Sequence, residues 1–248
     1  MSTATAAPTT GGSVRAEPGQ KRIRAYLGGE LVADTSRPLL VWENPKHPTY
    51  YFPPEDVLAE LEETGSEAHS PSRGDARILT VKTQNRKAPG GALRYDGSPL
   101  AEANGLIRLD FDAMDAWFEE DVEIFYSVRD PYTRVDILPS SRHVRVELDG
   151  VTVAESNRPT ILFETKLPAR FYLPKTDVRL DLLEPTDSET YCPYKGQAEY
   201  WSVNTGETVH QDIGWSYRTP LPESEGIAGL MAFYNNKVDL FVDGELQQ

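Results

Sequence analysis

The chain repeats one stretch of its own sequence at a spacing of 121 residues, and this repeat limits the folds that it can adopt. Residues 144–178 align without a gap on residues 23–57, and twelve of the thirty-five paired positions are identical. Many differences are conservative, such as Trp42 against Phe163. A period of this length that occurs twice is too long for a solenoid repeat and fits two copies of one domain.

The composition around the repeat sets the expected domain boundaries. Alanine, threonine, glycine and proline dominate the start of the chain, and this composition favours disorder. A segment with two prolines and two serines separates the copies and is typical of a linker. We therefore predict a disordered tail over residues 1–20, a first repeat domain over 21–127, a linker over 128–142 and a second repeat domain over 143–248.

Short hairpins and alternating strands dominate both copies. In the second copy, valine and leucine alternate with charged residues over 144–148, and Asp149-Gly150 then provides the turn. Gly28-Gly29 occupies the same place in the first copy. Residues 56–63 have helical composition, so a short helix is expected there. We predict a mainly β, β-rich α+β fold with two tandem β-tent-like or small barrel domains.

Two similar β domains with exposed edge strands have a physical reason to pack together. We expect them to be related by pseudo-two-fold symmetry, as in an internal version of a homodimer. The chain would then be a monomer with an internal pseudo-dimer, or a weak homodimer.

The overall charge and the residue usage argue against several classes of partner. The net charge of −14 repels phosphate backbones and anionic lipids, so we expect no nucleic-acid partner and no membrane partner. The single cysteine, Cys192, rules out an internal disulfide and multi-cysteine metal sites, and the four histidines are scattered. The N-terminus lacks the features of a secretory signal. We expect a cytoplasmic protein with no cofactor and no metal.

The second copy carries an ordered series of motifs that resembles a known family. The series includes Glu164, Tyr172-x-Pro174, Cys192-Pro193-Tyr194-Lys195-Gly196 and Trp215-x-Tyr217. In order and spacing it is similar to the bacterial and fungal family named domain of unknown function 427, which some catalogues label nucleotidyltransferase-like. The resemblance extends over nearly all of both copies.

The resemblance implies a β-tent domain similar in shape to the methionine sulfoxide reductase B group. Relatives in that group often hold zinc with paired Cys-x-x-Cys motifs, which this chain lacks, so that metal is not carried over. The first copy departs from the family pattern, with Ser72-Arg73 in place of Tyr194-Lys195. Any activity tied to those residues is therefore expected in the second copy.

Two glutamates are the main candidates for chemistry. Glu43 and Glu164 each end an apolar run, where a carboxylate is costly to bury without a partner. Arg37 and Arg158 lie six residues earlier in the two copies. One interpretation is a glutamate with a raised pKa that acts as a catalytic base or contacts a ligand. The other is a structural pair of arginine and glutamate, or a carboxylate at a strand end that lies in water.

Lys195 and the aromatic residues of the second copy are the candidates for ligand binding. Lys195 lies beside Tyr194 on a loop bounded by proline and glycine, and either meets an anionic or carbonyl ligand or is a surface lysine. Strand alternation sends Trp215 and Tyr217 to the same face, which forms either an aromatic pocket or part of the core. Arg158, Tyr172, Tyr194, Lys195, Trp215 and Tyr217 are the predicted ligand-binding residues.

Three functions from different classes fit these residues. We favour a small-molecule-binding protein whose pocket, lined by aromatic, glutamate and lysine side chains, lies mainly in the second copy. The first alternative is a transferase that transfers a nucleotidyl or acyl group with Glu164 as the base, with Glu43 as the candidate in the first copy. The second alternative is a structural or interaction module without a pocket.

Overall fold

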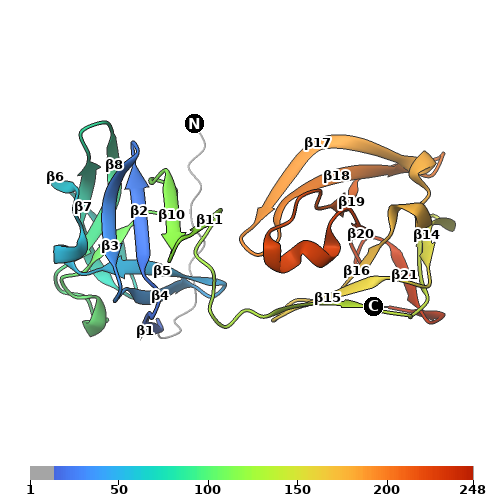
Figure 1. Cartoon of the computed structure of the whole chain (residues 1–248), viewed down its shortest axis with the longest axis horizontal. Helices are drawn as coiled ribbons and strands as arrows, with labels where there is room; N and C mark the ends of the chain where they lie inside the picture. The colour runs from blue at the N-terminus through green and yellow to red at the C-terminus, as the bar shows by residue number, and fades with distance from the viewer. Residues whose placement is uncertain (1–13, 248) are drawn as a thin grey trace. The chain divides into compact units, whose positions relative to one another are not determined.

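The chain divides into two compact units, Met1–Asp130 and Pro131–Gln248. A computed structural model describes residues 14–247. Each unit contains one seven-stranded sheet and one four-stranded sheet (Figure 1). This arrangement confirms the predicted mainly β fold with two similar halves. The sheets of the described residues are open and form no closed barrel, so the tent-like form of the prediction is the appropriate one.

The strands of unit 1 follow a simple antiparallel plan. Its seven-stranded sheet has the order β1 (Ala16–Pro18), β4 (Leu39–Asn44), β5 (His47–Phe52), β9 (Ile107–Leu109), β8 (Lys87–Tyr95), β7 (Gly74–Lys82) and β6 (Glu60–Ser70). Its four-stranded sheet has the order β3 (Glu30–Thr35), β2 (Ile23–Leu27), β10 (Ala116–Glu119) and β11 (Val122–Ile124). Two short 3-10 helices, η1 (Pro54–Asp56) and η2 (Ala101–Ala103), complete this unit.

Unit 2 has the same strand order in both of its sheets. The seven-stranded sheet contains β12 (Val135–Pro139), β15 (Thr160–Glu164), β16 (Arg170–Leu173), β20 (Met231–Phe233), β19 (Val209–Ser216), β18 (Gly196–Asn204) and β17 (Leu183–Cys192). The four-stranded sheet contains β14 (Val151–Ser156), β13 (Val144–Leu148), β21 (Asp239–Val242) and β22 (Glu245–Leu246). The 3-10 helices are η3 (Lys175–Asp177), η4 (Leu180–Leu182) and η5 (Pro222–Ile227).

The strand register repeats at the spacing of the sequence repeat. Ala16 of β1 pairs with Val41, and Ile137 of β12 pairs with Leu162, so both partners are shifted by 121 positions. The structural repeat therefore starts before the segment that is most similar in sequence. Strand β1 lies in the segment predicted as a tail, most of which falls outside the described residues, and β12 lies in the segment predicted as a linker.

Each seven-stranded sheet buries side chains on both faces, because successive residues of a strand point to opposite sides. On β16, Leu173 packs in a core with Val144 and Val146 of the four-stranded sheet. The neighbouring Tyr172 packs instead in a second cluster with Trp215 and other aromatic residues. The second face of the sheet is therefore aromatic, and η5 contributes the buried Ile227 to it.

The helix expected over residues 56–63 is wrong. Asp56 is the last residue of η1, and the chain then continues into strand β6, which pairs antiparallel with β7 from Glu60 to Ser70. The backbone hydrogen bonds of this long hairpin prevail over the weaker helical preference of glutamate and leucine.

The structural ion pair between Arg158 and Glu164, which was one interpretation of the sequence, is also wrong. Arg158 donates hydrogen bonds to Asp177 at the end of η3, at 3.0 Å to Oδ1, and Ser156 Oγ donates to the same carboxylate at 2.7 Å. Unit 1 repeats this arrangement with Arg37, Thr35 and Asp56. These hydrogen bonds lower the pKa of Asp177 to about 2. The bond from Arg158 has the largest effect, and the bond from Ser156 has the next largest.

We predict that Asp177→Asn destabilises unit 2 at neutral pH. Because the folded state lowers the pKa of Asp177, its contribution is complete above the ordinary carboxyl pKa of 3.8 and is lost as the pH falls through about 2. Urea denaturation at several pH values should show that the variant has a lower free energy of unfolding than the unaltered protein, and that this difference becomes smaller in acid. Asp181→Asn is the control, since its pair with Arg179 is more exposed. Equal losses for both variants, at all pH values, would contradict the prediction.

Candidate functional site

A pocket opens on the aromatic face of the seven-stranded sheet of unit 2. Its volume is about 170 Å³. Side chains from several strands and from the turns between them surround it: Leu162, Glu164, Leu167, Pro168, Arg170, Tyr172, Lys195, Tyr200, Trp215, Tyr217 and Tyr234. The lining thus combines three charged side chains with five aromatic rings.

Glu164 and Lys195 form an ion pair in the wall of this pocket. Glu164 is the last residue of β15, and Lys195 lies in the turn between β17 and β18. Their side chains are only 11% and 12% exposed, so the pair is largely withdrawn from solvent. Lys195 is held in place by its backbone, because its carbonyl accepts a hydrogen bond from Leu221 N at 3.1 Å and Gly196 follows with a φ of +93°.

The aromatic wall is linked by ring contacts and hydrogen bonds. Trp215 Nε1 donates to Tyr172 Oη at 3.2 Å, and the two rings meet edge to face. On its other side, Trp215 contacts Tyr234 with a centroid distance of 4.6 Å. The Tyr234 hydroxyl lies 3.1 Å from that of Tyr200. The rings therefore hold one another in fixed positions around the pocket.

Burial keeps the phenols of this wall protonated. It raises the pKa of Tyr172 and of Tyr217 above the ordinary value. Burial, followed by the hydrogen bond with Tyr200, raises the pKa of Tyr234 to about 12. At neutral pH these groups are neutral, so each hydroxyl can donate as well as accept a hydrogen bond.

The structure brings most of the predicted site residues together. Glu164, Tyr172, Lys195, Trp215 and Tyr217 all line the pocket. Arg158 and Tyr194 are not among its lining residues: Arg158 binds Asp177, and the Tyr194 carbonyl accepts a hydrogen bond from Ser224.

Arg170 is the charged lining residue that sequence reasoning missed. It lies two positions before Tyr172 on β16, so strand alternation sends both side chains to the same face. That periodicity was the available signal.

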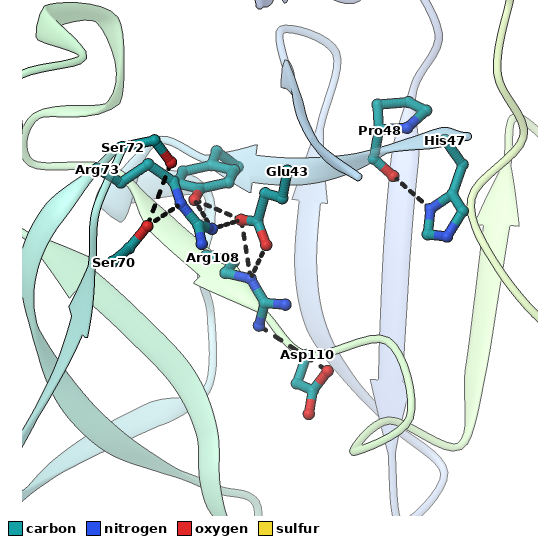
Figure 2. Close-up of polar contacts among 9 residues, drawn as sticks. Glu43, His47, Pro48, Ser70, Ser72, Arg73, Arg108 and Asp110 are labelled. Carbon is teal, nitrogen blue, oxygen red and sulfur yellow. Dashed lines mark hydrogen bonds and ion pairs between the residues drawn. The ribbon is translucent and has the colours of Figure 1, made fainter. Parts of the chain in front are cut away.

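Unit 1 contains a matching polar cluster centred on Glu43 (Figure 2). Glu43 forms an ion pair with Arg73, and it accepts hydrogen bonds from Arg108 Nε at 3.1 Å and from Tyr51 Oη at 2.6 Å. Arg73 also donates to Ser70 Oγ at 3.0 Å, as Figure 2 shows. The partners of Glu43 are thus Arg73 and Arg108, and Arg37 is not one of them.

The charges of this cluster determine how its members ionise. Burial acts to raise the pKa of Glu43, but Arg108 and Arg73 together outweigh it, so the pKa is lowered overall. Burial, reinforced by Glu43, raises the pKa of Tyr51. Glu43 is therefore an ionised carboxylate that is held by two arginines and a tyrosine hydroxyl.

The strand registers show which residues correspond in the two clusters. Tyr51 pairs with Arg108 across β5 and β9, whereas Tyr172 pairs with Ala232 across β16 and β20. Ala232 therefore takes the place of Arg108.

The next strand shows a second exchange. Leu93 of β8 pairs with Arg108, and Trp215 of β19 pairs with Ala232, so Trp215 takes the place of Leu93. The guanidinium that reaches Glu43 in unit 1 has no counterpart on β20.

Among residues 14–247, no group of three or more histidine, cysteine, aspartate or glutamate side chains is arranged to hold a metal ion. Within the same part of the chain, no helix has the length and apolar character needed to cross a bilayer.

Fold and site together define a class of protein with two tandem two-sheet β domains, each with a polar cluster on the outer face of its larger sheet. The chain belongs to the family described as Domain of unknown function (DUF427), also labelled NTP_transf_9, whose model matches residues 15–120 and 136–244. The matches start at β1 and β12, in agreement with the structural repeat. A comparison with curated proteins found no match.

We predict that Arg108→Met destabilises unit 1 by about 2 kcal/mol, the scale of a hydrogen bond to a charged group. Arg73 remains as a partner, so the variant should still fold. Since Glu43 has a lowered pKa, the stability that it contributes is present above the ordinary carboxyl pKa and is lost in acid. In the variant the pKa of Glu43 lies closer to the ordinary value, so this acid-dependent loss should be smaller.

Hydrogen exchange of the unit 1 strands in increasing urea would measure this effect. Arg94→Met is the matched control, because Arg94 pairs with Asp96 on an exposed part of the same unit. An Arg108→Met protein as stable as the control variant would show that the cluster contributes little.

Proposed function

We propose that unit 2 binds a compact small molecule in the pocket beside Glu164 and Lys195, and that the protein does so in the cytoplasm. The observation that carries this proposal is the convergence of a largely buried ion pair and an aromatic wall on one open volume. A pocket with apolar rings and a few fixed polar groups is the usual form of a small-molecule site.

The size of the pocket supports a small ligand. Its volume of about 170 Å³ is below the roughly 300–1,000 Å³ of sites that enclose drug-sized molecules. A single ring with one polar substituent matches this space better than a nucleoside triphosphate does. Trp215 and Tyr234 would supply stacking surfaces, and the neutral phenols would supply hydrogen bonds.

The alternatives have less support. As the base of a transferase, Glu164 would need a carboxylate oxygen free to take a proton from the substrate, but its Oε2 is held in the ion pair with Lys195. A module that acts only by packing would need a filled sheet face, and the pocket on this face is an argument against it.

We predict that Lys195→Met weakens ligand binding by about tenfold or more, on the scale of a lost charge-assisted hydrogen bond. The change removes one wall charge and leaves Glu164 without its partner. A thermal-shift screen against nucleotides, sugars and aromatic metabolites would identify ligands, and calorimetry would compare their affinities for the variants.

Lys175→Met is the matched control for this experiment. Lys175 is also a partly buried lysine of unit 2, and its ammonium lies 4.7 Å from the ring centroid of Trp201, which packs against the other core of the sheet. The control should bind every identified ligand as the unaltered protein does. Unchanged affinities in Lys195→Met would mean that the ligands bind elsewhere.

A further inference from the structure

The polar clusters of the two units differ in their balance of charge. In unit 1, Glu43 and Asp110 accompany Arg73 and Arg108, with Arg108 3.8 Å from Asp110, so two negative charges meet two positive ones. The cluster is neutral and closed by its own side chains.

In unit 2 the same backbone positions carry different charges. Ala232 replaces Arg108, and two residues further along Tyr234 replaces Asp110. On β16, Arg170 replaces Thr49, since each pairs with the equivalent residue of the preceding strand. The pocket therefore contains one carboxylate, Glu164, and two cations, Lys195 and Arg170, which leaves one positive charge in excess.

Arg170 is the source of this excess charge. Its side chain lines the pocket and is half-buried, and its guanidinium carbon lies 5.8 Å from the ring centroid of Trp215. Among the described residues it has no hydrogen-bond acceptor and no carboxylate partner, whereas the carboxylate of Glu164 is taken by Lys195. A planar guanidinium with unused donors matches a carboxylate through two parallel hydrogen bonds.

The positive charge of Arg170 lies in a pocket of a protein that is negatively charged overall. The whole chain has a net charge of −14, so a positive excess inside its pocket opposes the general field of the protein. An anion that enters the pocket meets Arg170 where solvent is partly excluded and electrostatic attraction is stronger than at the surface.

We propose that the ligand of the unit 2 pocket is a compact aromatic monocarboxylate, with its carboxylate on Arg170 and its ring against Trp215 and Tyr234. This inference rests on the proposed function and specifies the chemical class of the ligand. One excess charge matches a monoanion, and the small volume matches a single ring.

Three probes of the same shape test the charge preference directly. Benzoate, benzamide and benzamidine share one ring and a planar substituent but are anionic, neutral and cationic. We expect calorimetry or ligand-observed NMR to show that benzoate binds about tenfold more tightly than benzamide, and that benzamidine binds most weakly. Phenyl phosphate tests the kind of anion, and tighter binding of phenyl phosphate than of benzoate would overturn the assignment of a carboxylate.

Arg170→Met tests the assignment to this residue. It removes the charge but keeps an unbranched apolar side chain, so the preference for benzoate over benzamide should disappear while benzamide affinity changes little. Arg179→Met is the control, because it removes the same charge from an exposed pair with Asp181 in the same unit and should leave the preference intact.

The outcomes separate this inference from the proposed function. Equal affinities for benzoate and benzamide, or a full preference for benzoate in Arg170→Met, would overturn the inference and leave the binding pocket in place. Failure of all three probes to bind would also overturn it. The wider ligand screen with Lys195→Met would then decide the proposed function on its own.

Discussion

The alternation of side chains along the seven-stranded sheets is the constraint on which the rest of each unit depends. One face of each sheet must pack against a four-stranded sheet, and this fixes the register, since a slip of one residue would send every side chain to the wrong side. Tyr51 and Tyr172 are thereby directed to the opposite face, where they lie in the second cluster of their unit. The polar residues that point to the same side as Tyr51 and Tyr172 are therefore brought together, because packing against the four-stranded sheet fixes the register of all the strands.

A buried carboxylate at a strand end then dictates its surroundings. Glu43 and Glu164 lie near the ends of equivalent strands and need a cationic partner, because an unpaired buried charge is very costly. In both units the turn of the long hairpin supplies that partner. It is Arg73 between β6 and β7 in unit 1, and Lys195 between β17 and β18 in unit 2. The pair recurs in two diverged copies, and in unit 2 both of its members also line the pocket. What distinguishes unit 2 is the set of positions where the copies differ, such as Ala232 in place of Arg108.

Much of the fold, and part of the site, could be predicted from the sequence. The repeat and its hairpin turns are local signals, and the common orientation of Trp215 and Tyr217 follows from strand periodicity. The partner of Arg158 could not be predicted, because it depends on how η3 folds back beside β14. The helix predicted over residues 56–63 overlaps the start of strand β6, since the composition of that segment alone does not show its hairpin pairing with β7. The strand register that relates Arg108 to Ala232 likewise becomes visible only in the folded sheet.

Two paired positions exchange large and small side chains between the units. They lie on β8 and β9 in unit 1 and on β19 and β20 in unit 2, and they explain why the same fold carries a closed polar cluster in one unit and a pocket in the other. Unit 1 pairs the small Leu93 with the long Arg108, whereas unit 2 pairs the large Trp215 with the small Ala232, so the bulk moves from one strand to its neighbour. Arg108 extends to Glu43 and completes a network of charges. Trp215 has a single polar group, which it directs to Tyr172, and its ring stays as a flat wall. The exchange therefore leaves β20 without the cation that closes the polar network of unit 1, and a pocket lies beside Trp215 in unit 2.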